Sequence, residues 1–242
     1  MAPISTAKPP PGTSAPRLAA TVVVVRPRKT GPEPEIFMVR RSARSAFMPD
    51  ALVFPGGKVD PGDGEAESDA AFVAGARREC HEEAGIALDG RRLHWFDTWI
   101  TPSAEPRRFY ARFFLARVGA DEARDAAADG HETHEGRWAT AAEHLEAWRS
   151  GAVDLPPPTA CTLMRLAVPS WTEILGWAEA IAKPPILPKW LGDARGEGRM
   201  EVVMPHDPEY AELPGEGMPA GPRLGGLPRR FVREGSTWRP CE

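Results

Sequence analysis

The stretch RRECHEEAGI, residues 77–86, concentrates charge in a way that decides how the chain is interpreted. Its glutamates Glu79, Glu82 and Glu83 are spaced i, i+3 and i+4, so on an α-helix they project from one face. Like charges at this spacing repel each other and weaken a helix, and a hard divalent cation with oxygen ligands would relieve that repulsion. The pattern therefore indicates either a solvated charged face or one wall of a metal site.

The flanking residues predict the helix and favour the metal site. Ser68 or Asp69 is a suitable N-cap, residues 70–85 have helical spacing, and Gly85 stands where a helix ends. Upstream, the Pro-Gly-Gly turn at 55–57 lets the backbone approach a ligand closely. The turn therefore shifts the balance away from a solvated face.

Patterns elsewhere in the chain predict a mixed α+β fold with extra C-terminal helices and a hairpin. Apolar and β-branched runs predict strands at 18–25, 35–42, 51–54, 93–100, 107–118, 136–140 and 200–205. Helices are expected within 141–151, 156–167 and 170–182, and a hairpin within 227–240. Strands mixed with helices in this order predict a mixed β-sheet between helices.

The composition excludes several classes of protein. The 242 residues are 42% hydrophobic, enough for one large domain, and a net charge of −4 gives no electrostatic basis for nucleic-acid binding. The cysteines Cys80, Cys161 and Cys241 are far apart, which argues against disulfides and a zinc site. The apolar run at 18–25 is too short to span a bilayer. We therefore expect a cytoplasmic protein with a small-molecule ligand and neither a nucleic-acid nor a membrane partner.

Together, the turn and the helix resemble the signature of the Nudix hydrolases. That signature runs Gly, five residues, Glu, seven residues, then Arg-Glu-apolar-x-Glu-Glu-x-Gly-apolar. The chain fills the final part from Arg78 to Ile86, and FPGG at 54–57 supplies the starting Gly57. The resemblance implies the Nudix fold, an α/β/α sandwich.

The composition of the first residues and the resemblance together suggest a domain organisation. We expect a flexible tail at 1–16, a Nudix hydrolase domain at 17–183, and a C-terminal extension at 184–242. The extension would pack on the domain or on a partner subunit in a homodimer. With the helices at 157–182, it would form either an acyl/pantetheine pocket or a dimer interface.

The middle of the signature departs from the family pattern. Asp63 stands six residues after Gly57, where the family has glutamate, and fourteen residues rather than seven separate it from Arg78. Counting back from Arg78 gives Ala70, which is next to Asp69. The loop therefore carries an insertion, and Asp63, Asp69 or neither replaces the first acid.

The resemblance implies a site for Mg²⁺ or Mn²⁺. Arg78 would orient a glutamate through a salt bridge. The family has a late acid six residues before a tryptophan, which makes Glu132 the candidate before Trp138 and leaves Glu135 as the alternative. This acid would bind a second metal ion or act as general base. The expected metal ligands are the Gly57 carbonyl, Glu79, Glu82, Glu83 and Glu132. The expected catalytic residues are Glu79, Glu82, Glu132 and Arg78.

The implied reaction is hydrolysis of a nucleoside diphosphate linked to another moiety. Water attacks a phosphorus atom, and no covalent enzyme intermediate is needed. Cys80 occupies the apolar position of the signature and is expected in the core. His81 occupies its free position and is expected to be exposed.

The segment RRSARSAFMPDALVFPGG, 40–57, is similar to the Nudix branch that contains peroxisomal and bacterial coenzyme A diphosphatases. Arg41-Ser42 precedes FPGG at that branch's spacing, whereas Ala46 stands where the branch tends to have Arg and Asp50 where it tends to have Gly. Coenzyme A or an acyl-CoA is therefore the expected substrate, and an ADP-ribose or nucleotide-sugar diphosphatase is the alternative. A non-catalytic nucleotide sensor is a further alternative, but such domains usually lose helix glutamates that this chain keeps. The expected substrate-binding residues are Arg41, Arg107, Arg108, Phe54 and Gly56.

Overall fold

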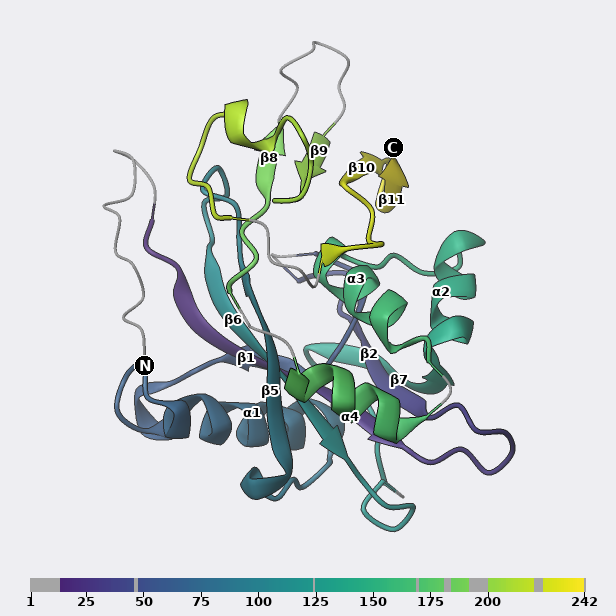
Figure 1. The fold of residues 1–242 in the computed structure, drawn as a ribbon. Coiled ribbons are helices and arrows are strands. Elements are labelled where there is room, and N and C mark those ends of the chain that lie inside the picture. The colour runs from purple at the N-terminus through teal and green to yellow at the C-terminus, as the bar shows by residue number, and fades with distance from the viewer. Residues whose placement is uncertain are drawn as a thin grey trace.

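The chain forms a mixed β-sheet with helices on both faces and a second, smaller sheet (Figure 1). A computed structural model describes residues 14–45, 48–123, 125–168, 170–180, 184–191, 200–219 and 224–241. The main sheet and its helices are β1 (Arg17–Arg26), β2 (Glu35–Arg41), β3 (Leu52–Val53), β4 (Gly56–Lys58), α1 (Asp69–Ala84), β5 (Leu93–Ile100), β6 (Phe109–Arg117), β7 (Thr133–Thr140), α2 (Ala141–Arg149), α3 (Pro157–Leu166) and α4 (Trp171–Ala180). The second sheet contains β8 (Lys189–Leu191), β9 (Met200–Val203), β10 (Arg230–Glu234) and β11 (Thr237–Cys241). The predicted α+β fold, with a mixed sheet between helices, is confirmed.

β1 lies in the interior of the main sheet, which explains its uninterrupted apolar sequence. It pairs in parallel with β6 and antiparallel with β2. Val22 and Val24 belong to the core on the α1 side, whereas Val23 and Val25 belong to the core that includes α2, α3 and α4. Because helices cover both faces, alternate residues are equally buried and the strand reads as one apolar run.

β1 and β2 pair at one end and diverge at the other. β1 bonds to β2 through residues 24–26 and to β4 through residues 19–21, while β2 bonds to β3 through residues 39–40. The short strands β3 and β4 therefore fill the gap between the diverging strands. The sequence predicts a strand at 51–54 and a loop from Lys58 onward, so β4 is a correction, since glycine has low strand propensity. The glycine turn is consequently fixed within the sheet.

Helix α1 begins and ends where the sequence predicts. The Ser68 hydroxyl accepts a hydrogen bond from the Ala71 N–H at 3.1 Å, so Ser68 is the N-cap. Gly85 has a left-handed φ of 67° and donates its N–H to the His81 carbonyl. Phe72, Ala76, Cys80 and Ala84 form a buried stripe at intervals of four residues. Cys80 is in the core and His81 is exposed, as expected.

The C-terminal residues extend and cover the main sheet. Ile186 donates its N–H to the Thr98 carbonyl and accepts from the Ile100 N–H, both at 2.8 Å, along the edge of β5. The Trp148 indole donates to the Trp238 carbonyl at 2.8 Å, which joins α2 to β11. The predicted strand at 200–205 and the hairpin within 227–240 are present as β9 and as β10 with β11.

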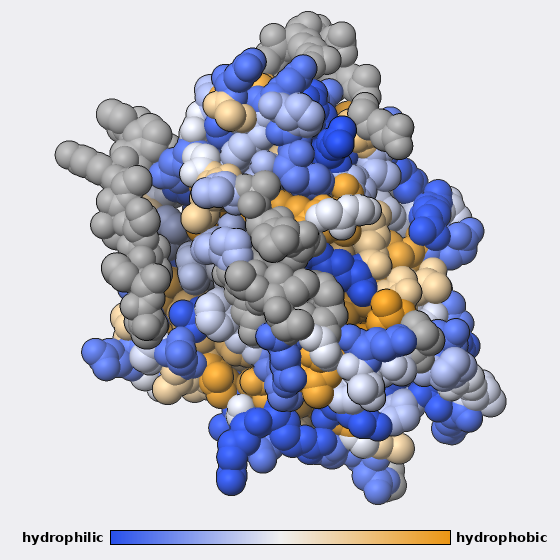
Figure 2. All heavy atoms as spheres, in the orientation of Figure 1, coloured by the Kyte–Doolittle hydropathy of each residue, from blue (hydrophilic) through white to orange (hydrophobic). Residues whose placement is uncertain are grey.

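The face seen in Figure 2 shows apolar side chains mainly near its centre and hydrophilic ones along its rim. Among the described residues, Met200, at 38% exposure, is the one large apolar side chain that counts as exposed. In the same residues, no helix is both long and apolar enough to cross a bilayer. Residues 1–13 of the predicted tail, and Ala46, lie outside the described residues.

Candidate metal and catalytic site

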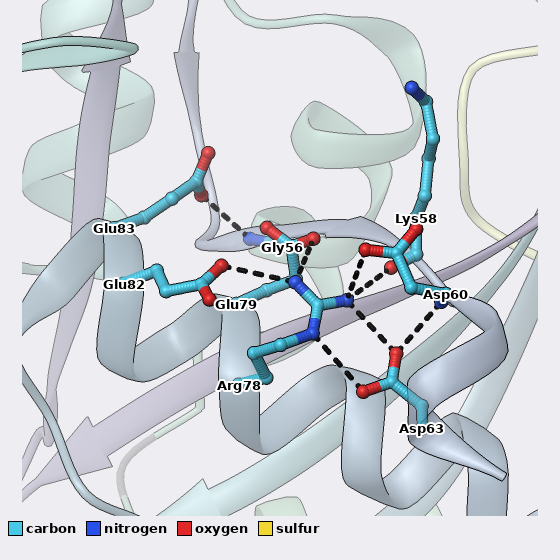
Figure 3. Close-up of polar contacts among 8 residues, drawn as sticks. All are labelled: Gly56, Lys58, Asp60, Asp63, Arg78, Glu79, Glu82 and Glu83. Atoms are coloured by element: carbon cyan, nitrogen blue, oxygen red, sulfur yellow. Dashed lines mark hydrogen bonds and ion pairs between the residues drawn. The ribbon is translucent and has the colours of Figure 1, made fainter.

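Arg78 joins the helix to the glycine turn and the loop that follows it (Figure 3). On the helix side, its Nη1 lies 2.9 Å from the Glu79 carboxylate and 3.0 Å from that of Glu82. On the loop side, Nη2 donates to the Lys58 carbonyl at 2.9 Å. Arg78 therefore fixes two of the three glutamates relative to β4.

Asp63 takes the place opposite Arg78 that the sequence leaves open. Its two carboxylate oxygens accept from Arg78 Nε at 3.1 Å and from Nη2 at 2.9 Å. Bonding to Arg78 lowers the pKa of Asp63, so the acid is charged. Asp69 instead pairs with Arg112, and Ala70 is exposed. The inserted residues therefore lie after Asp63, between it and the start of α1.

Gly57 lies directly against the carboxylate of Glu79. A β-carbon on Gly57 would come within 2.4 Å of the Glu79 carboxylate. Any larger residue at position 57 would force the Glu79 carboxylate to move from this position. Burial raises the pKa of Glu79, even though Arg78 favours its charged form.

Glu83 is the most buried carboxylate of the three, with 5% exposure. The Gly56 N–H donates to one of its oxygens at 2.9 Å (Figure 3). Burial raises the pKa of Glu83 to about 7, and the nearby charge of Glu79 adds to this. The helix face is therefore not a solvated surface, because two of its carboxylates carry a desolvation cost that a cation would offset.

The carboxylates do not converge on one point as they are placed. Within the described residues, no group of three His, Cys, Asp or Glu side chains is close enough together to hold a metal ion. Glu79 and Glu82 turn to Arg78, while Glu83 turns to Gly56. The donor chemistry still fits a hard divalent cation, because the oxygens are carboxylate oxygens beside a turn where a β-carbon would clash. Rotation of the Glu79 and Glu82 side chains would be required.

The two candidates for the late acid differ in their surroundings. The charge of Glu132 contributes to the raised pKa of both Glu79 and Glu83. Glu135, by contrast, pairs with Arg40 at 3.7 Å. Glu132 is therefore the acid whose charge acts on the helix glutamates.

Arg41, at the end of β2, faces the same group of charges. Its positive charge acts on Glu83, opposing the rise in the pKa of that carboxyl. Its guanidinium donates to the Ser45 hydroxyl at 2.8 Å and 3.2 Å. A register shift between Arg40 and Arg41 interrupts the pairing of β2 with β7. Arg41 is thus beside the site, as a substrate-binding residue must be.

Two of the predicted substrate-binding residues are placed elsewhere. Phe54 is 3% exposed and packs edge-on against Phe113, at 6.5 Å between ring centroids, so it is a core residue. Arg108 is also buried and bonds to Glu216 and to the carbonyl of Thr101. Both placements argue against contact with substrate.

The remaining two predicted residues differ in their surroundings. Arg107 is exposed in the bend two residues before β6, not in the strand as predicted. Gly56 is at the site, where its N–H holds Glu83. Its glycine identity is required by β1, because a β-carbon on Gly56 would come within 2.5 Å of the Ala20 carbonyl oxygen.

The sequence patterns did not single out the turn before β7. The Asp129 carboxylate accepts hydrogen bonds from the backbone around Glu132. An aspartate followed by glycine is a turn signal, and it was the available clue.

Comparisons with known proteins agree with this geometry. The family model of the NUDIX domain matches residues 15–155. A Caenorhabditis elegans protein named "Putative nudix hydrolase 7" is 28% identical over 214 residues, covering 73% of this chain and 70% of that protein. A solved NUDIX hydrolase from Alicyclobacillus acidocaldarius is 25% identical with a TM-score of 0.60, covering 68% of this chain and 96% of that one.

Proposed function

Because this chain belongs to the NUDIX domain family, we propose that it hydrolyses a nucleoside diphosphate linked to another moiety, with a divalent metal ion. The predicted enzyme class, a Nudix-type hydrolase, agrees with the family match and with the relative's name. The observation that carries the proposal is the group formed by Gly57, Glu79 and Glu83, where glycine turn and buried carboxylates meet. Buried carboxylates with raised pKa values beside a glycine turn are more typical of a functional site than of a solvated helix face.

The metal site we propose uses the Gly57 carbonyl and the carboxylates of Glu79, Glu82, Glu83 and Glu132. Mg²⁺ or Mn²⁺, when bound there, would neutralise negative charge on the phosphate oxygens. Arg78 positions Glu79 and Glu82 from the loop side, supported by Asp63. The Gly56 N–H positions Glu83.

The reaction needs a group that accepts a proton from water. We assign this role to Glu132, whose negative charge acts on Glu79 and Glu83 although the residue is not part of α1. The water oxygen forms a bond to one phosphorus as the bridging P–O bond breaks, and the proton passes to the Glu132 carboxylate. Two phosphate-bearing products leave, and the enzyme is not covalently modified.

The substrate we propose is coenzyme A or an acyl-CoA. Support comes from the similarity of residues 40–57 to that Nudix branch and from the position of Arg41, whose guanidinium suits a phosphate group. Asp50, where that branch tends to have glycine, has a left-handed φ of 63°. Aspartate tolerates this conformation, and two hydrogen bonds from Arg40, at 2.8 and 3.0 Å, hold it. The loop is thus kept in the shape that glycine would allow.

A substrate panel tests the proposal. Purified protein is assayed with Mg²⁺ and with Mn²⁺ on coenzyme A, an acyl-CoA, ADP-ribose, NADH and a nucleotide sugar. We expect metal-dependent cleavage with the highest kcat/KM for coenzyme A or the acyl-CoA. Reaction in ¹⁸O-labelled water should place one label in a single product phosphate. Best turnover of ADP-ribose or the nucleotide sugar would replace the substrate assignment, and binding without turnover would favour the sensor.

A further inference from the structure

The carboxylate of Asp129 accepts several hydrogen bonds from the backbone of the turn that carries Glu132. Its Oδ1 accepts from the Thr133 N–H and hydroxyl, both at 2.8 Å, and from the His131 N–H at 3.1 Å. Its Oδ2 accepts from the Glu132 N–H at 3.2 Å. Three consecutive backbone N–H groups thus point at one side chain, in the manner of a backbone anion-binding nest.

A second contact holds the other end of the Glu132 peptide unit. The Glu132 carbonyl accepts from the Ser42 N–H at 2.8 Å, next to Arg41. Gly130 allows the turn, because its φ of 78° is in the left-handed region. The backbone of Glu132 is therefore fixed on both sides, by Asp129 and by the loop after β2.

The side chain of Glu132 has no comparable support. Within the described residues, no hydrogen bond or ion pair holds its carboxylate, and the residue is exposed. The position of the Glu132 Cα, and with it the region that the carboxylate can reach, is thus set by the backbone alone. Any loss of order in the turn would move the carboxylate away from the helix glutamates.

We infer that Asp129 is a positioning residue that holds Glu132 in place for the hydrolysis. The inference rests on the proposed function, because it assumes that Glu132 takes part in the reaction. Asp129 acts through the three N–H groups and the Thr133 hydroxyl, without contacting substrate. Since a small misplacement of a catalytic group costs up to about 100-fold in rate, the loss of this anchor should lower kcat.

A double-mutant cycle tests this. Asp129→Ala and Glu132→Gln are made singly and together, and kcat is measured with Mg²⁺ on coenzyme A, or on ADP-ribose if that is the better substrate. We expect Asp129→Ala to lower kcat about tenfold in the wild type and less than about twofold in the Glu132→Gln background. Asp129→Asn keeps one acceptor oxygen and should retain most of the turnover.

The matched control is Asp89→Ala. Asp89 accepts the Arg91 N–H at 3.0 Å in a similar turn before β5, with no part in the site. Its removal should leave kcat unchanged. Hydrogen exchange of the 131–133 amides, followed by mass spectrometry, measures the order of the turn independently of activity. The exchange should be faster in Asp129→Ala.

The outcomes are distinguishable. An equal fold-loss from Asp129→Ala in both backgrounds would overturn the positioning role while leaving Glu132 catalytic. Unchanged kcat despite faster exchange of the 131–133 amides would overturn it as well. Wild-type kcat in Glu132→Gln alone would instead remove Glu132 from the proposed mechanism, and the inference with it.

Discussion

Arg78 on α1 and Arg230 on β10 each lie among several carboxylates, yet their surroundings differ. Arg230 forms a two-pronged pair with Asp207, at 2.7 and 2.9 Å, and reaches Glu209 at 2.6 Å. Arg78 forms a similar pair with Asp63. Around Arg78, however, the acids extend beyond its reach, to Glu83 and Glu132.

The pKa shifts report this difference. Bonding to Arg230 lowers the pKa of Asp207, as expected of a satisfied ion pair. Burial raises the pKa of Glu79 and Glu83, and neighbouring negative charges add to the rise in both. The acid paired with Arg230 is therefore stabilised in its charged form, as in a structural contact, whereas Glu79 and Glu83 carry a desolvation cost that a cation would offset.

The largest expected effect is a loss of kcat when an acid beside Arg78 is changed, but not when an acid beside Arg230 is changed. Glu82→Gln removes a ligand charge from the helix face and should lower kcat about 100-fold or more with Mg²⁺, while circular dichroism shows an unchanged fold. Glu209→Gln, the matched change beside Arg230, should leave kcat unchanged. A Glu82→Gln enzyme with full activity would contradict the metal-site assignment.

A change in the Arg230 cluster should have the opposite result, lowering stability but not activity. Asp207→Asn breaks the two-pronged pair with Arg230 and should lower the free energy of unfolding by about 2 kcal/mol in urea denaturation. The kcat should remain within about twofold of the wild type, because the pair belongs to the second sheet. A stability unchanged by Asp207→Asn would show that the Arg230 cluster contributes nothing structurally.

Gly57→Ala tests the close approach of β4 to α1. The new β-carbon would lie 2.4 Å from the Glu79 carboxylate, so that side chain must move, and kcat should fall about tenfold. Gly62→Ala is the control in the following loop, since nothing lies within 4 Å of its β-carbon. Equal activity of the two variants would be inconsistent with the role given to Gly57.

The smallest expected effect is the contribution of His144, a core residue outside the site, to the pH dependence of folding stability. Burial lowers the pKa of His144 to about 4, against an ordinary value of 6.5. Because the unfolded chain binds this proton first, stability is lost as pH falls below about 6.5 and continues to fall toward 4. The loss from this group between pH 7 and 5.5 is about 1 kcal/mol. The free energy of unfolding of His144→Gln, measured with denaturant, should lack this part of the pH dependence. The same pH profile in the variant and the wild type would contradict the role given to His144.

The parts of the site that depend on local order could be predicted from the sequence. The spacing within α1, the Ser68 cap and the Gly85 end are properties of a single helix, so periodicity and capping residues identify them. Which acid pairs with Arg78, Asp63 or Asp69, depends on the path that the inserted loop takes across α1. No residue spacing encodes that path, so the sequence left the alternatives open.

Two of the predicted substrate-binding residues are buried, and both for a related reason. Arg108 is buried because Glu216, more than one hundred residues later, pairs with it. Phe54 is buried because β6 brings Phe113 against it. Charge and position near a motif suggested both as substrate-binding residues, but burial is set by tertiary contacts between distant segments.

Mn²⁺ binding, measured by isothermal titration calorimetry, tests the central claim most directly. The wild type, Glu83→Gln and Glu209→Gln are titrated under the same buffer conditions. We predict that Glu209→Gln binds Mn²⁺ as the wild type does, whereas Glu83→Gln binds it at least about tenfold more weakly. Equal Mn²⁺ affinity in all three proteins would contradict a metal site on α1.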